Sequence, residues 1–131
     1  MGSKIEDSLS KLEAVLDRLH EALSEDSSNP LFIDGTVQRF EFVFELTWKT
    51  LKRALETEGL ICTTPRETLK TAYQIGWINE EDLWVQMLDD RNSTSHTYDE
   101  PIAFEIYNNI KGYYPALRRL AQLLRAKHPV Q

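Results

Sequence analysis

Cysteine, glycine and proline are scarce in this chain, and each shortage excludes a class of protein. Cys62 is the only cysteine among 131 residues, which excludes an internal disulfide and a cysteine-based zinc site. Five glycines and five prolines are too few for a loop-rich β-sandwich or a collagen-like chain. Cys62 has no second thiol and no basic cluster beside it in the sequence, so we do not expect a catalytic thiol.

Long apolar runs are also missing. No uninterrupted stretch approaches the roughly 20 apolar residues that a membrane span needs, and no basic segment with an apolar core begins the chain as in a secretory signal. We therefore expect a cytoplasmic protein that does not associate with membranes. The length and the 41% hydrophobic content suit a single domain over residues 1–131.

Basic residues are in the minority, with 15 Lys and Arg against 21 Asp and Glu, a net charge of −6. Generic binding of nucleic acid over the whole surface is therefore not expected. Residues 79–100 hold seven acids and one base, whereas residues 106–131 hold five bases and no acid. We interpret the basic segment as a solvated helix face that suits its own C-terminal dipole, with binding of an anionic partner as the alternative.

Apolar residues recur at helical spacing along most of the chain. They predict three long amphipathic helices, over residues 5–23, about 34–58, and from Asp99 into the basic segment. Two shorter helices are predicted at about 65–75 and 80–92. No segment shows the alternation of a strand. The sequence therefore predicts an all-α fold, an up-and-down antiparallel bundle of about five helices, three long and two short.

Small polar residues, proline and glycine set the predicted helix boundaries. The polar turn at residues 24–30 stops the first helix, and Gly59 ends the second. Thr64 opens a capping box in front of the third helix, which Gly76 ends. Asn79, followed by three acids, caps the fourth helix.

Residues 89–98 gather a guanidinium, an imidazole and a phenol between two predicted helices. On one continuous helix Arg91 and His96 would point about 140° apart and could not act together. The run from Asn92 to Ser95 consists of residues that weaken a helix, so we expect the helix to end there and His96 to turn back toward Arg91.

Arginine and histidine at this spacing support a definite chemistry. The guanidinium of Arg91 suits phosphate oxygens, and the imidazole of His96 can move a proton near neutral pH. The two together could cleave RNA without a metal ion, with Arg91 stabilising the phosphorane charge. The structural alternative is that Arg91 pairs with Asp89 or Asp90 while His96 caps a helix end.

The spacing of Arg91, His96 and Tyr98 resembles the R-x4-H-x-Y signature of the HEPN superfamily. Residues 38–49 and the segment 65–76 are similar to its branch of nucleotidyltransferase substrate-binding subunits, which are related to HepT-type toxins. The likeness extends from about residue 5 to residue 125.

The resemblance implies a helical bundle that dimerises and places the two motifs in a shared cleft. It implies a minimal nucleotidyltransferase as the partner, with no cofactor and no metal ion. By position, Arg91 and His96 would be catalytic in RNA cleavage, Tyr98 would be adenylylated by the partner, and Asn92 would help to position them. The matching helix also contains charged residues to which the resemblance assigns no chemical role: Glu41, Glu45 and Lys49.

Acidic residues crowd the motif and would repel RNA phosphates: Asp89, Asp90, Asp99 and Glu100. We therefore place a substrate-binding or regulatory subunit first, a metal-independent ribonuclease second, and a plain helical interaction domain third. Dimerisation is a further expectation, because one small bundle does not obviously bury all of Phe42, Val43, Leu46 and Trp84.

Overall fold

We describe the protein from a computed structural model that covers residues 4–25, 29–93 and 99–130 in detail. Within these ranges the chain forms five helices and no strand. Three helices are long and two are short, so the predicted all-α bundle is confirmed. The helices are α1 (Lys4–Leu23), α2 (Pro30–Thr57), α3 (Pro65–Gln74), α4 (Glu81–Asn92) and α5 (Glu100–Lys127).

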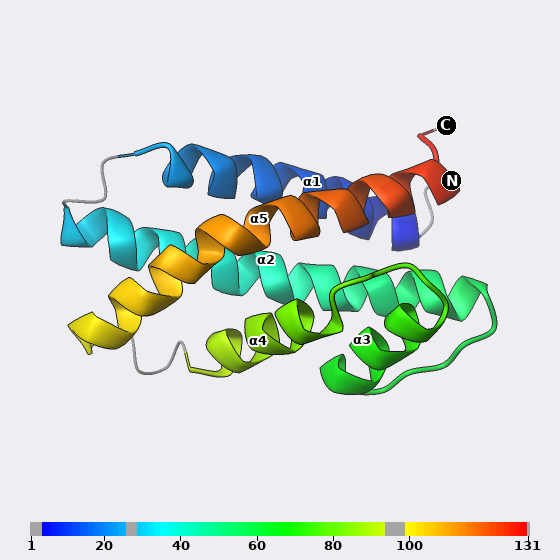
Figure 1. Cartoon of the computed structure of the whole chain (residues 1–131). Helices are drawn as coiled ribbons and strands as arrows, with labels where there is room; N and C mark the ends of the chain where they lie inside the picture. The colour runs from blue at the N-terminus through cyan, green and yellow to red at the C-terminus, as the bar shows by residue number, and fades with distance from the viewer. Residues whose placement is uncertain (1–3, 26–28, 94–98, 131) are drawn as a thin grey trace.

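The second helix is the centre of the arrangement, because α2 contacts each of the other four helices. Helices α1 and α2 run antiparallel, and α5 crosses them obliquely (Figure 1). The short helices α3 and α4 pack against each other and against α2. The two ends of the chain lie at the same end of the bundle in Figure 1.

Two predicted helix starts need correction. Helix α2 begins at Pro30 rather than near Asp34, because the Asn29 side chain caps it by accepting the Leu31 N–H at 2.9 Å. Proline fits the first turn of a helix, where its missing N–H costs nothing. Helix α4 has Glu80 at its N-cap and no side-chain cap hydrogen bond, so the cap predicted at Asn79 is wrong.

The other boundary signals are confirmed. The Thr64 hydroxyl accepts the Glu67 N–H at 3.1 Å, which is half of the predicted capping box. Gly59 and Gly76 follow α2 and α3 with φ of 81° and 82°, in the left-handed region that favours glycine.

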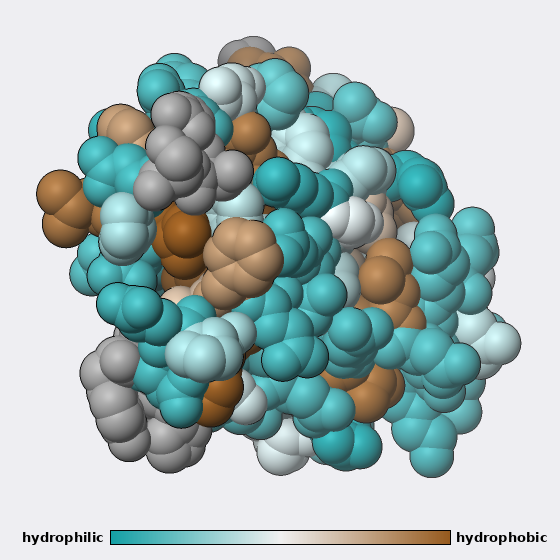
Figure 2. Space-filling view, turned by 60° about the vertical axis from the view of Figure 1, so that its left-hand side comes forward, coloured by the Kyte–Doolittle hydropathy of each residue, from teal (hydrophilic) through white to brown (hydrophobic). Residues whose placement is uncertain are grey.

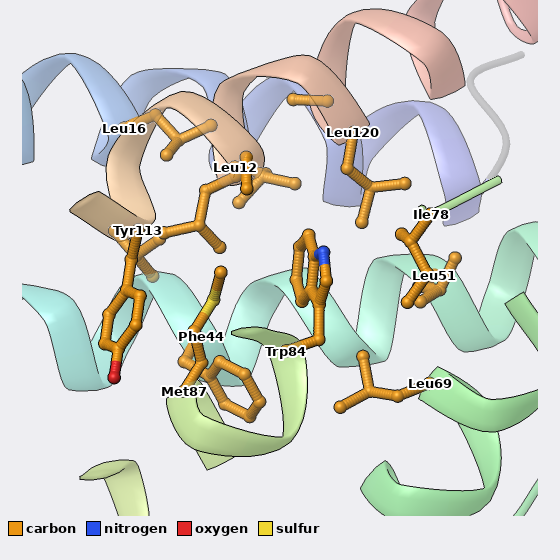
Figure 3. Close-up of a cluster of buried hydrophobic side chains, with 14 of the residues drawn as sticks. Leu12, Leu16, Phe44, Leu51, Leu69, Ile78, Trp84, Met87, Tyr113 and Leu120 are labelled. Carbon is orange, nitrogen blue, oxygen red and sulfur yellow. The ribbon is translucent and has the colours of Figure 1, made fainter. Parts of the chain in front are cut away.

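The core lies between α2 and the helices around it. In Figure 3 the Trp84 indole points from α4 into this space, with Met87 on one side and Leu69 on the other. Tyr113 of α5 packs against the same core, while its hydroxyl points away from Leu12. Because a tryptophan fills the gap between α4 and the long helices, the position of α4 is set by packing.

The surface differs from the one expected from the sequence. Val43 and Trp84 are 0% and 2% exposed, so a single protomer buries both, and the argument for dimerisation from these two residues is wrong. Leu46 is partly buried, and Phe42 is 62% exposed.

Three of the eight large hydrophobic side chains that are exposed among the described residues lie where α2 and α5 begin. Figure 2 brings this end of the bundle forward and shows separate brown side chains among teal ones. We call the large exposed residues of these two helix starts the end group: Leu31, Phe32 and Phe104.

The basic last helix uses much of its charge inside the chain. Arg118 and Arg125 lie 2.6 Å from Asp17 and Glu13 of α1, and these pairs join α5 to α1. Arg119 lies 3.4 Å from Glu80. In the part of the chain described, no helix has the length and hydrophobicity needed to cross a bilayer.

Candidate functional site

Arg91 lies in the last turn of α4, where its Nε is 3.3 Å from Oε2 of Glu45 on α2. The same Glu45 oxygen accepts a hydrogen bond from the Trp48 indole N–H at 3.1 Å. About a third of each charged side chain is exposed, and the Nε of Arg91 is itself buried. The structural alternative, in which Arg91 pairs with Asp89 or Asp90, is wrong, because the ion pair among the described residues is with Glu45.

Asp90 points to α5 instead. One of its oxygens accepts hydrogen bonds from the Tyr113 hydroxyl at 2.5 Å and from the Asn109 amide at 3.1 Å. Burial, together with the hydrogen bond and the charge of Asp90, raises the pKa of Tyr113 far above its ordinary value. The phenol therefore keeps its proton and continues to donate to Asp90 throughout the physiological pH range.

Asp89 completes the set with a weaker contact, 3.9 Å from Arg66 of α3, where both side chains are largely exposed. Consecutive residues of a helix point about 100° apart. Asp89, Asp90 and Arg91 therefore reach α3, α5 and α2 in turn. The two hydrogen bonds of Asp90, together with the buried side chains of Trp84, Met87 and Leu88, set the rotation of α4 about its axis. The direction in which Arg91 points follows from this fixed rotation.

The remaining motif residues follow directly in the chain. Helix α4 ends at Asn92, as the helix-weakening run predicts, and the Asn92 side chain is exposed. The Ser93 hydroxyl donates to the Asp89 carbonyl at 3.1 Å and closes the last turn. His96 and Tyr98 lie outside the described residues, so their predicted approach to Arg91 stays a prediction.

The described site offers a cation at a helix end and no metal-ligand cluster. A guanidinium carries five N–H donors, of which Nε is one, and its geometry matches phosphate and carboxylate groups. Among the residues that the structure describes, no group of three or more His, Cys, Asp or Glu side chains could hold a metal ion. The arrangement suits binding of an anionic group such as a phosphate.

Comparison with known proteins places the chain in a family. The sequence model of the family "Nucleotidyltransferase substrate binding protein like" matches residues 5–126. The chain belongs to this family. It is a HepT-like relative within the HEPN superfamily, as the resemblance of its motif predicts. A Haemophilus influenzae protein named "Probable ribonuclease HepT" is 35% identical over 101 residues, which span 73% of this chain and 69% of that protein.

Two solved structures share the fold. A crystal structure of a Thermus thermophilus protein is 34% identical and has a TM-score of 0.83, covering 87% of this chain and 98% of that one. A Haemophilus influenzae protein, HI0074, is 29% identical with a TM-score of 0.80, covering 89% of this chain and 98% of that one. The second is described as the fold of a substrate-binding domain of a nucleotidyltransferase.

The partners of the α4 end do not follow from the sequence. In the sequence, Glu45 is notable only because it lies in the helix that matches the family. Asn109 and Tyr113 are notable only as members of the last helix. The one sequence signal that could have pointed to Glu45 as a partner of Arg91 is its position on α2, about one turn before Trp48 and beside the apolar stripe. Which acid reaches Arg91 depends on the rotation of α4, and the helical period of one segment does not contain that information.

The Asp90 contacts should contribute to stability far more than those of Asp89. Asp90→Ala leaves two buried or half-buried donors on α5 without their acceptor, and should lower the free energy of unfolding by about 2 kcal/mol. The matched control Asp89→Ala removes a long, exposed ion pair and should change it by less than about 0.5 kcal/mol. Urea denaturation followed by circular dichroism measures both, and equal losses would contradict the proposed anchoring.

Proposed function

We propose that this protein is the substrate-binding or regulatory partner subunit of a minimal nucleotidyltransferase. The observation that carries the proposal is the family match over residues 5–126, nearly the whole chain. The likeness to a structure described as a substrate-binding domain of a nucleotidyltransferase supports it independently of the motif. Nucleotidyl transfer itself would reside in the partner enzyme.

Arg91 is the residue of this chain that we assign to the bound anion. Its side chain is about a third exposed, lies at the end of α4 and pairs with Glu45. Such a preset cation binds a phosphate without first ordering a long side chain, which lowers the entropic cost of binding. In the proposal, Asn92 and Tyr98 border the same site, and Tyr98 is the group presented to the nucleotidyltransferase.

The functional unit in this proposal is a dimer with a second copy of the chain. The end group exposes Leu31, Phe32 and Phe104 beside a groove of about 360 Å³ lined by residues of both helix starts. Helix α5 begins at Glu100, two residues after Tyr98. A twofold contact across the end group would therefore bring the two motifs together, the arrangement that the HEPN resemblance implies.

Assembly with the nucleotidyltransferase tests the first proposal. The tagged protein, co-expressed with the minimal nucleotidyltransferase that the proposal expects a neighbouring gene to encode, should elute with that enzyme as one species heavier than either component. An unrelated helical protein with the same tag is the control. Independent elution of the two proteins at micromolar concentration would contradict the proposal.

A metal-independent ribonuclease of the HepT type is the second candidate. It is favoured by the 35% identity to the protein named "Probable ribonuclease HepT" and by the partial exposure of the Arg91 side chain. In this mechanism a ribose 2′-hydroxyl attacks the adjacent phosphorus, and the bond to the 5′-oxygen breaks. His96 takes the proton of the 2′-hydroxyl and returns a proton to the leaving 5′-oxygen, which leaves a 2′,3′-cyclic phosphate. Arg91 stabilises the charge that develops on the phosphorane oxygens.

Substitution of His96 distinguishes the ribonuclease from a purely structural role of the motif. Purified protein should cut RNA in the presence of EDTA, and His96→Ala should lower the rate by about 100-fold or more while the melting temperature is retained. His20→Ala is the matched control, because His20 is an exposed histidine on α1.

Two results would count against the ribonuclease. If wild type and His96→Ala leave RNA equally intact, the chain does not cut RNA. If His96→Ala or Arg91→Ala lowers only the melting temperature and changes neither cleavage nor assembly, the motif is a structural network.

A further inference from the structure

A basic groove lies away from the motif, between the start of α1 and the C-terminal half of α2. It has a volume of about 660 Å³ and lies at the end of the bundle where the chain begins in Figure 1. Four bases and one acid line it: Lys4, Lys49, Lys52, Arg53 and Glu56. Trp48 also lines it and is partly buried against the core.

The charge of this groove opposes that of the molecule. The whole chain has a net charge of −6, yet the groove lining has an excess of three positive charges. One base, Lys52, pairs with Glu56 at 3.6 Å, which accounts for the single acid. A hollow lined by one sign of charge focuses the electric field and attracts ions of the opposite sign, here anions.

The face of α2 that lines the groove continues to Glu45. Glu45, Trp48, Lys52 and Glu56 are spaced by 3, 4 and 4 residues, so they share a helix face over about 16 Å. Trp48 lines the groove and donates its indole N–H to Glu45, the residue that holds Arg91.

We propose that this groove binds a single strand of RNA, with its phosphates on Lys4, Lys52 and Arg53 and a base against the Trp48 ring. Basic grooves that contain an aromatic side chain are the common design for single-stranded nucleic acid, because charge holds the backbone and any base can stack. An acidic peptide would use the same charges but would gain little from the indole. The choice of RNA over DNA rests on the ribonuclease candidate, whereas the assignment of the groove to a polyanion does not.

Fluorescence anisotropy with a labelled 12-nucleotide single-stranded RNA tests the proposal. The RNA carries 2′-O-methyl groups, so binding is measured without cleavage. The double variant Lys52→Gln/Arg53→Gln should weaken binding by at least about 10-fold at 0.1 M salt, and the slope of log K against log salt should become shallower by about 1.4, which corresponds to two lost phosphate contacts. The matched control is Arg18→Gln/Lys70→Gln, which removes one exposed arginine and one exposed lysine outside the groove lining.

Three outcomes would overturn the proposal. The first is that wild type does not bind the RNA, and the second is that the groove variant and the control variant lose affinity equally. The third is that a peptide of twelve glutamates binds the groove more tightly than the RNA does, which would make an acidic protein segment the occupant.

The proposal that the groove binds RNA and the proposal that the protein assembles with a nucleotidyltransferase can be contradicted independently. Lys52→Gln/Arg53→Gln should still elute with the nucleotidyltransferase, and weakened RNA binding in that intact assembly supports the groove. If wild type binds RNA through the groove but does not assemble with the nucleotidyltransferase, only the proposed partnership is contradicted.

Discussion

The last turn of α4 is the constraint on which the site depends. Asp90 accepts two hydrogen bonds from α5, and Arg91 pairs with Glu45 of α2. Trp84, about two turns earlier on the same helix, is buried in the core and sets the depth of α4. Packing therefore fixes where α4 lies, and packing together with the Asp90 hydrogen bonds sets its rotation. The ion pair of Arg91 contributes little to stability at its partly exposed position, so its main consequence is the direction of the guanidinium.

Charge is distributed unevenly over this acidic protein. Much of the basic last helix pairs with α1, and those arginines serve the fold. The groove takes one base from α1 and three from α2, and its Trp48 donates a hydrogen bond to Glu45, the partner of Arg91. Substrate binding and the chemistry of the motif would in this way be connected through one face of a single helix.

The sequence predicts those features that depend on local spacing. Apolar periodicity gives the five helices, and the signals at Thr64, Gly59 and Gly76 give their ends. The start at Pro30 is not predicted, because a proline can follow one helix or begin the next, and only the Asn29 cap decides between the two. The pairing of Arg91 with Glu45 joins residues far apart in the chain, and an excess of nearby acids gives no reason to choose α2. The burial of Val43 and Trp84 likewise depends on how α4 docks on α2.

The central claim is that the two motifs of a dimer face one another beside a preset Arg91. Asn92 is exposed and adjacent to Arg91, so Asn92→Cys in a Cys62→Ala background reports on this geometry directly. A short bis-maleimide should join two such chains into a covalent dimer on denaturing gels, while Ile61→Cys in the same background stays monomeric. If Asn92→Cys also stays monomeric although the protein is dimeric by light scattering, the motifs do not meet, and the account is contradicted.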